Sequence, residues 1–313
     1  MDVFRFFCWN SSRLSSFFVL ENEFGYNKKT MEEFEYIIKK IENSNIEKNH
    51  FEYVYIENFL SEKHFKMLLE DRQIRIPSFS KIEELIEYLE NNGYEAQYFP
   101  GCTIDKKEYI EWFYDRTKQS DAMYLTSDFG MTYKIIKYVN KDVENIVKFF
   151  NSDKFIQTLM KKFGKTGTID KDAGVQKYLS GYEISPHPDV RRKCVTYMIN
   201  INHMGEEEAD IYTKFMKLKK PYDKLYDFWE TNKDYERNAV PWSWCETFLE
   251  QKKNNSIFIF PPSNSSIHAV KLDYNCLEKQ RTQIYGNIWY RNMEHLHFTS
   301  VDKMVQILKG DNR

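Results

Sequence analysis

The chain has 313 residues, 42% of them hydrophobic and 17% aromatic, which is ample for one large core or a core with a smaller subdomain. Its 45 basic and 47 acidic residues nearly balance, so a broad nucleic-acid-binding surface is not expected. Five scattered cysteines without a Cys-x-x-Cys pair argue against a disulfide framework or a zinc ribbon, and fit a reducing, cytoplasmic location.

The first fifty residues are predicted to form an extension followed by a helix. The apolar blocks in residues 1–20 are interrupted by Asn10-Ser11-Ser12-Arg13, so neither reaches the ~20 residues that a membrane helix needs. No later segment is long and apolar enough either, and no signal peptide is expected. Thr30 is a candidate N-cap for a helix in which Phe34 and Ile37 begin an apolar face.

Residues 51–173 are predicted to be a mainly helical support region. An alternating stretch, 51–56, is typical of a strand. Capping residues and apolar spacing predict helices over 61–69, 81–91, 106–118 and 151–163. Ser61 is a candidate N-cap, and Gly93 is expected to stop the second of these helices. The aromatic-rich residues 94–140 give no clear division into elements.

From Gly174 onward the pattern changes to short strands separated by turns. The predicted strands cover residues 175–184, 194–201, 209–216, 256–260, 267–271 and 282–291. Such a series indicates a double-stranded β-helix, or jelly-roll, core over 174–300, with the preceding helices buttressing one sheet. The fold class is therefore α+β, in one structural unit. Residues 217–255 form an aromatic-rich insertion, and insertions of this length are often lids or binding loops.

A His-x-Asp pair, His187-Pro188-Asp189, lies just before the apolar run 194–199. Side chains two residues apart on an extended backbone point to the same side, so both can reach one metal ion. Two ligands leave a divalent ion undersaturated, and His268, after the strand-like residues 257–260, is the candidate third ligand. Two histidines and one carboxylate on one face of Fe(II) leave the other face open.

The last half of the chain carries further residues in a recognisable order around these three. They are Tyr178, Gly181, His187, Asp189, Lys193, Thr196, Ile199, Asn200, His268, Val270, Arg281, Trp289 and Tyr290. This ordered set resembles the Fe(II)/2-oxoglutarate-dependent oxygenases, in particular their prolyl-hydroxylase-like branch. The resemblance implies Fe(II) at His187, Asp189 and His268, with 2-oxoglutarate as cosubstrate and O2 as oxidant.

The same resemblance implies that Arg281 anchors the distal carboxylate of 2-oxoglutarate, because a guanidinium can grip a carboxylate through two parallel hydrogen bonds. Lys271 and Lys279 are rivals for this role. Tyr178 stands where the family places a tyrosine that contacts 2-oxoglutarate, although a packed core tyrosine explains it nearly as well.

Candidate substrate contacts lie near the metal residues and in the insertion. Arg191 and Arg192 follow the His-x-Asp pair and either bind an anionic substrate or are solvated turn residues. Trp229, Trp242 and Trp244 either stack on a substrate or pack the insertion, and packing is the favoured interpretation.

Hydroxylation of an unactivated C–H bond in a small molecule or a peptide side chain, with release of succinate and CO2, is the expected reaction. Desaturation or ring formation would use the same ligands. A non-catalytic jelly-roll binding or scaffold module is the alternative, and a cupin-like enzyme with another metal is a third possibility. The expected partner is a small-molecule or peptide substrate, without nucleic acid or membrane.

Overall fold

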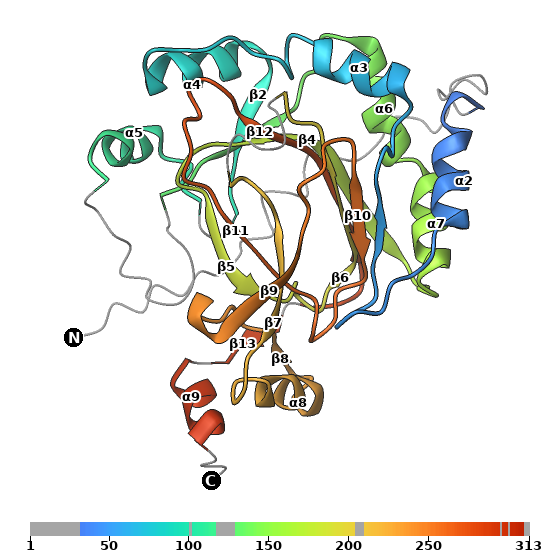
Figure 1. Cartoon of the computed structure of the whole chain (residues 1–313), viewed down its shortest axis with the longest axis vertical. Coiled ribbons are helices and arrows are strands. Elements are labelled where there is room, and N and C mark those ends of the chain that lie inside the picture. Colours follow the sequence, from blue (N-terminus) through green and yellow to red (C-terminus); the bar gives the residue numbers. More distant parts are fainter. Residues whose placement is uncertain are drawn as a thin grey trace.

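Two antiparallel sheets face each other in the computed structural model, with helices along one side and a small helical group below (Figure 1). The structure describes residues 32–99, 102–116, 129–203, 210–294, 296–299 and 301–309. The candidate N-cap Thr30 and residues 1–31 in general lie outside this part. Within it, no helix combines the length and the hydropathy needed to cross a membrane.

The larger sheet has seven strands. In spatial order they are β1 (Val54–Ile56), β10 (Ile257–Phe260), β6 (Lys193–Asn200), β12 (Arg281–Tyr290), β4 (Ile169–Tyr178), β3 (Thr132–Ile135) and β2 (Tyr94–Gln97). The smaller sheet has four, in the order β5 (Glu183–His187), β11 (Ile267–Lys271), β7 (Lys214–Leu218) and β9 (Cys245–Glu250). A short parallel pair joins β8 (Tyr235–Glu236) to β13 (His297–Phe298).

The described helices are α2 (Glu35–Asn43), α3 (Glu62–Glu70), α4 (Ile82–Asn91), α5 (Lys106–Tyr114), α6 (Lys141–Phe150), α7 (Asp153–Lys162), α8 (Lys224–Thr231) and α9 (Val301–Lys309), with a 3-10 turn η2 (Trp242–Trp244). The predicted N-cap Ser61 accepts a hydrogen bond from the backbone of His64, and Ser152 does the same at α7. Gly93 follows α4 with φ of +82°, and a Cβ there would lie 2.4 Å from the carbonyl oxygen of Lys137. The helix stop at Gly93 therefore has a steric as well as a conformational cause.

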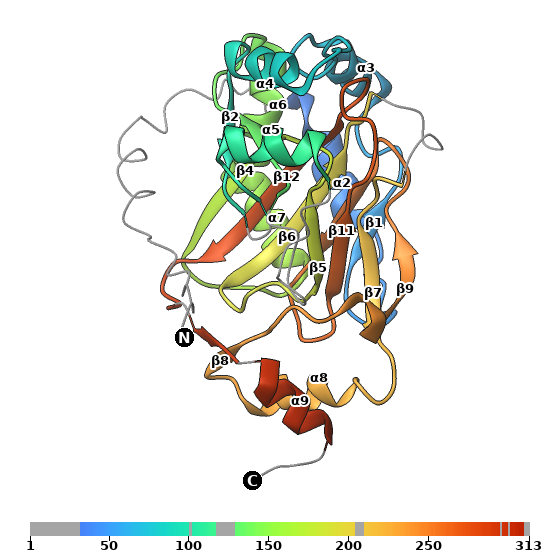
Figure 2. The ribbon, with the colours of Figure 1, turned by 90° about the vertical axis from the view of Figure 1, so that its left-hand side faces the viewer.

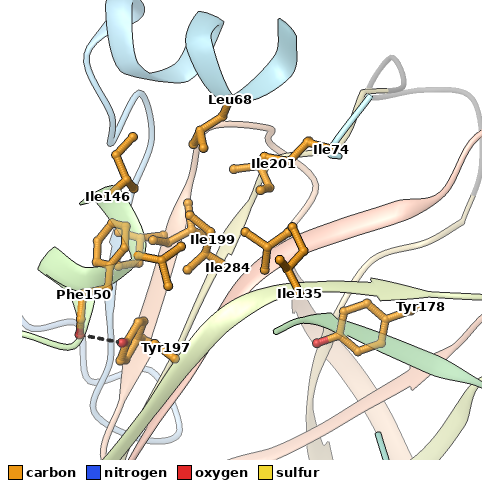
Figure 3. Close-up of a cluster of buried hydrophobic side chains, with 14 of the residues drawn as sticks. Leu68, Ile74, Ile135, Ile146, Phe150, Tyr178, Tyr197, Ile199, Ile201 and Ile284 are labelled. Carbon is orange, nitrogen blue, oxygen red and sulfur yellow. Dashed lines mark hydrogen bonds between the residues drawn. The ribbon is translucent and has the colours of Figure 1, made fainter. Parts of the chain in front are cut away.

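The main core lies between the larger sheet and the helices that cover its outer face (Figure 3). Tyr197 and Ile199 point from β6 toward these helices, and the Tyr197 hydroxyl donates to the carbonyl oxygen of Phe150 at 3.0 Å. Gly286 of β12 lies under this tyrosine, where a Cβ would come within 2.2 Å of the ring. Because residues alternate along a strand, this packing directs Thr196 and Asn200 to the opposite, inner face.

The inner faces of the two sheets also contact each other. The rings of Phe215 on β7 and Phe258 on β10 stack with centroids 3.7 Å apart. They belong to an apolar cluster that also contains Phe51 and Phe260. This cluster fills one side of the space between the sheets, and the residues of the candidate site line the other parts.

Two regions carry more strand than the sequence predicts. Besides β1, which the alternating stretch 51–56 predicts, the support region 51–173 contributes β2 and β3 to the larger sheet, and β4 begins before residue 174. The insertion 217–255 contains α8 and β8 and supplies β9 to the smaller sheet.

A group that we call the base, residues 219–240 with 297–299 and 301–309, lies below the sheets (Figure 2). Met304 of α9 packs there with Leu225 and Trp229 of α8. The insertion is therefore a folded part of the molecule, joined to the C-terminal helix.

Candidate metal centre

The three predicted metal ligands meet at the lower end of the smaller sheet. Strand β11 lies between β5 and β7, and its His268 is the register partner of His187 on β5. The two imidazole centroids are 4.5 Å apart. With Asp189, just past the end of β5, they offer ligand atoms that all lie within 4.8 Å of one another. The convergence predicted from the sequence is confirmed, and the group could hold a metal ion.

Both imidazoles are held in the form that binds a metal. Nδ1 of His187 lies 2.8 Å from the carbonyl oxygen of Ser185, and Nδ1 of His268 lies 3.0 Å from that of Ser266. A carbonyl only accepts, so each Nδ1 carries the proton and each Nε2 keeps a free lone pair. Burial lowers the pKa of His187 to about 3, with His268 acting in the same direction, and burial also lowers the pKa of His268. Both rings are therefore neutral at neutral pH.

The carboxylate of Asp189 is buried and held through both oxygens. Lys193 Nζ donates to Oδ1 at 2.6 Å, and the Thr196 hydroxyl donates to Oδ2 at 2.7 Å. Burial raises the pKa of Asp189, but the charge of the Lys193 ammonium and its hydrogen bond outweigh burial and hold this pKa below its usual value. The group is thus ionised and fixed in direction.

Lys193 is itself placed by β12. Its ammonium lies 3.1 Å from the Tyr285 hydroxyl and 5.2 Å from the ring centroid of Trp289. Sequence reasoning identified Lys193 only as a position in the family pattern, without its contact to Asp189. The contact follows from the turn between β5 and β6, which brings residues 189 and 193 together at the start of the second strand.

Strand β12 presents a polar stripe to the space between the sheets. Its inward residues are Arg281, Gln283, Tyr285, Asn287 and Trp289, and we call them the β12 stripe. Near the metal residues, Asn287 Oδ1 lies 3.4 Å from the Thr196 hydroxyl oxygen. Farther away, the Gln283 amide donates to Asn200 at 2.7 Å. The period-two pattern of polar residues in 281–289 is the sequence signal that could have revealed this stripe.

Arg281 begins the stripe and is 2% exposed. Its Nη2 donates to the Thr213 hydroxyl at 2.9 Å, and its guanidinium carbon lies 4.5 Å from the ring centroid of Tyr178. Among the described residues, no carboxylate forms an ion pair with it. A buried guanidinium without a carboxylate partner is costly, so the position suits an anionic ligand.

The separation of Arg281 from the metal residues fits a short dicarboxylate. Thr213 precedes Phe215, the β7 partner of His268, by two residues. At ~3.3 Å per residue this is about 7 Å along the same inner face. An extended five-carbon dicarboxylate has a comparable length, so one end can reach the metal residues while the other meets Arg281.

The other predicted cosubstrate residues take different places. The Tyr178 hydroxyl donates to Gln176 Oε1 at 2.8 Å, and its ring supports the Arg281 guanidinium from below. Lys271 is exposed and pairs with Glu183 at 3.0 Å. Lys279 lies two residues before Arg281 and is partly exposed. Of these candidates, the buried Arg281 has the geometry for an internal anion.

The two arginines after the ligand pair contact the chain itself. Arg191 Nε donates to the carbonyl oxygen of Tyr235 at 2.8 Å, and its Nη2 donates to that of Trp229 at 2.5 Å. The guanidinium of Arg192 lies over the Trp289 ring at 5.8 Å, and its Nε donates to the carbonyl oxygen of Tyr290 at 3.3 Å. Arg191 thus joins the base to the loop that carries Asp189.

The three tryptophans of the insertion are packed to different degrees. Trp229 is 1% exposed in the core of the base. Trp242 donates from Nε1 to Glu183 at 2.8 Å, and Trp244 stacks on Tyr222 with centroids 4.6 Å apart. These contacts favour the packing interpretation over a stacking platform for a substrate.

No family model matches the sequence, and no curated protein matches it. The fold is similar to a Trichoplax adhaerens prolyl hydroxylase solved in complex with a hypoxia-inducible factor peptide fragment, at 12% identity and a TM-score of 0.40, covering 84% of this chain and 90% of that one. It is also similar to a Pseudomonas putida prolyl-4-hydroxylase, at 10% identity and 0.35, covering 67% and 98%. A third similar structure is HygX from Streptomyces hygroscopicus with nickel, 2-oxoglutarate and hygromycin B bound, at 8% and 0.32, covering 70% and 92%.

Proposed function

We propose that this protein is an Fe(II)- and 2-oxoglutarate-dependent dioxygenase built on a double-stranded β-helix. It hydroxylates an unactivated C–H bond of a small molecule or a peptide side chain, with release of succinate and CO2. The observation that carries the proposal is the meeting of two neutral imidazoles and one ionised carboxylate at His187, His268 and Asp189. The carboxylate-free guanidinium of Arg281 supports it.

Each residue has a defined task in this proposal. His187, Asp189 and His268 would hold the metal from one side, and Arg281 would hold the far carboxylate of 2-oxoglutarate. When bound, Fe(II) and 2-oxoglutarate activate O2, so that one oxygen atom enters the substrate and the other enters succinate. Lys193 fixes the direction of the Asp189 carboxylate. The buried inner face keeps bulk water away from the reacting C–H bond.

A non-catalytic binding or scaffold module is the alternative. The observation in its favour is the ion pair between Lys193 and Asp189, at 2.6 Å, because it already neutralises the carboxylate without a metal. In that case the three residues would be a structural cluster. The two proposals differ in whether the protein binds Fe(II) and 2-oxoglutarate together.

An anaerobic titration separates them. We expect Fe(II) plus 2-oxoglutarate to give the folded protein a weak visible charge-transfer band, which His268→Ala removes. Arg281→Gln is expected to keep Fe(II) binding and to weaken 2-oxoglutarate binding by about 10- to 100-fold, since a buried charge-assisted contact is lost. Absence of the band in a protein with a native circular dichroism spectrum would favour the module. Succinate release once O2 is admitted would exclude the third possibility, a cupin-like enzyme with another metal and no 2-oxoglutarate.

A further inference from the structure

A segment of the base, residues 235–240, is hydrogen-bonded to the stretch that carries His187 and Asp189. The backbone N–H of Val240 donates to the carbonyl oxygen of Pro186 at 2.8 Å, next to His187. The backbone N–H of Arg191 donates to Glu236 Oε2 at 2.8 Å, two residues after Asp189. Residues 235–240 are therefore held against this loop at both ends.

Arg237, in the middle of this segment, is a buried cation. It is 4% exposed, and its Nε has no hydrogen-bond partner. Within the described residues, no hydrogen bond or ion pair engages its guanidinium. Burial, together with the charge of Arg191, lowers the pKa of Arg237 to about 10, whereas the charges of Asp189 and Glu236 oppose this shift. The side chain thus lies within electrostatic range of the Asp189 carboxylate.

Other buried polar atoms that have no hydrogen-bond partner among the described residues lie in or near the same segment. They are Trp229 Nε1, Glu236 Oε1, Asn238 Oδ1 and Thr299 Oγ1. Asn238 follows Arg237 and donates from Nδ2 to the carbonyl oxygen of Thr299, so these atoms belong to one neighbourhood of the base. Native proteins rarely leave buried polar groups unsatisfied, and their concentration here indicates a place where a polar ligand completes the hydrogen bonds.

The local charge selects the sign of that ligand. Three cations, Arg191, Lys193 and Arg237, lie around two carboxylates, Asp189 and Glu236. One positive charge is left over, and a divalent metal at Asp189 would add to it. An anion is therefore the ligand that this side of the centre would stabilise.

We infer that Arg237 is a substrate-binding residue that receives a carboxylate or phosphate group of the substrate at the metal centre. The inference rests on the proposed function. Among the described residues, Arg281 and Arg237 are buried arginines whose guanidiniums form no ion pair with a carboxylate. We assign Arg281, between the sheets, to the cosubstrate and Arg237, on the base, to the substrate. A planar guanidinium suits both anions because it can donate two parallel hydrogen bonds.

Anion binding to the metal-free protein tests this without any turnover. Inorganic phosphate and acetate are titrated by calorimetry into wild type, Arg237→Gln, Arg281→Gln and Arg291→Gln. Arg291 is an exposed arginine paired with Asp170 and serves as the matched control. We expect Arg237→Gln to lose at least tenfold in affinity for the better-binding probe, while Arg291→Gln keeps it. Arg281→Gln removes the second buried guanidinium and shows how much probe binding belongs to that site. The stronger of the two probes identifies the substrate group as phosphate or carboxylate.

Thermal unfolding separates this role from a structural one. Arg237→Met should unfold at a higher temperature than wild type without ligand, because it removes an unpaired buried charge. Saturating probe should raise the Tm of wild type by a few degrees more than that of the variant. If Arg237→Gln does not fold, Arg237→Lys is used for the same titration. We expect it to bind the better-binding probe several-fold more weakly than wild type does.

Wild-type probe affinity in Arg237→Gln or Arg237→Lys would overturn the inference. So would a selective loss of 2-oxoglutarate affinity in Arg237→Gln, which would put this residue in the cosubstrate site. A missing charge-transfer band would count against the proposed function alone, because the phosphate and acetate titrations need neither iron nor 2-oxoglutarate.

Discussion

The buried amine of Lys177 should give the protein a stability that increases with pH above neutrality. Lys177 is 0% exposed, on the face of β4 opposite Tyr178, and its Nζ donates to the carbonyl oxygen of Ile74 at 2.7 Å and to Thr282 Oγ1 at 2.9 Å. Burial lowers its pKa from 10.5 to about 7, with Asp71 partly opposing. Between these values the unfolded chain binds a proton that the folded chain does not, so the free energy of unfolding rises with pH.

The size of the effect follows from the two pKa values. Each pH unit across this window is worth at most about 1.4 kcal/mol, and the half-titrated start near pH 7 reduces the gain between pH 7 and 9 to roughly 2 kcal/mol. In Lys177→Met this gain should vanish. The lost hydrogen bonds to Ile74 and Thr282 lower the stability of the variant, but by an amount that changes little with pH.

Urea unfolding of wild type and Lys177→Met at pH 7, 8 and 9 measures the difference, and other titrating groups cancel in the comparison. Lys106→Met, at an exposed lysine paired with Glu90, controls for the loss of one lysine. The stability advantage of wild type over Lys177→Met should grow with pH. An advantage that does not grow with pH would show that the amine stays charged inside the fold up to pH 9.

Three further changes test the metal centre and the helices. Asp189→Asn should lower Mn(II) affinity by about 100-fold or more in an anaerobic calorimetric titration, because a charged ligand is lost, and an unchanged affinity would exclude Asp189 as a ligand. Thr196→Val, nearly the same size, should cost about 10- to 100-fold in the same assay by removing the donor to Oδ2, and tighter binding would contradict this. Ser152→Ala should destabilise the protein by about 1 kcal/mol in urea through loss of the α7 cap, and no effect would show that the cap is dispensable.

The elements that could be predicted are those with strong local signals. Ser61 and Ser152 marked helix starts, and Gly93 marked a stop, because caps and positive φ act within a few residues. Helix α6 was missed because it lies directly before the Ser152 cap, with only residues 151–152 between the two helices. Strands β2 and β3 were hidden in an aromatic-rich stretch, because their place in the sheet is fixed by pairing with each other and with β4 rather than by local pattern.

The convergence of His187, Asp189 and His268 was predictable because residue types and order along the strands carry it. The environment of each charged side chain could not be predicted from the sequence. Arg191, in the pair Arg191-Arg192, and Arg237 both lie in connecting segments, yet the fold binds the first to backbone carbonyls and leaves Nε of the second buried without a partner among the described residues. Tertiary contacts of the base, which the sequence does not reveal, determine which arginine binds backbone carbonyls and which remains available for a ligand.

The arrangement of the candidate site depends on the register of β12, the central strand of the larger sheet. On one face it carries Arg281 and Asn287, and on the other it carries Ile284 and the Gly286 that makes room for Tyr197. A deletion of one residue within β12 would exchange the two faces of the strand beyond the deletion. Its amide side chains would then be buried among aliphatic residues, and its isoleucines would point toward the metal residues. Evolutionary change within this strand should therefore occur by substitution alone, whereas insertions and deletions should accumulate in the loops outside it.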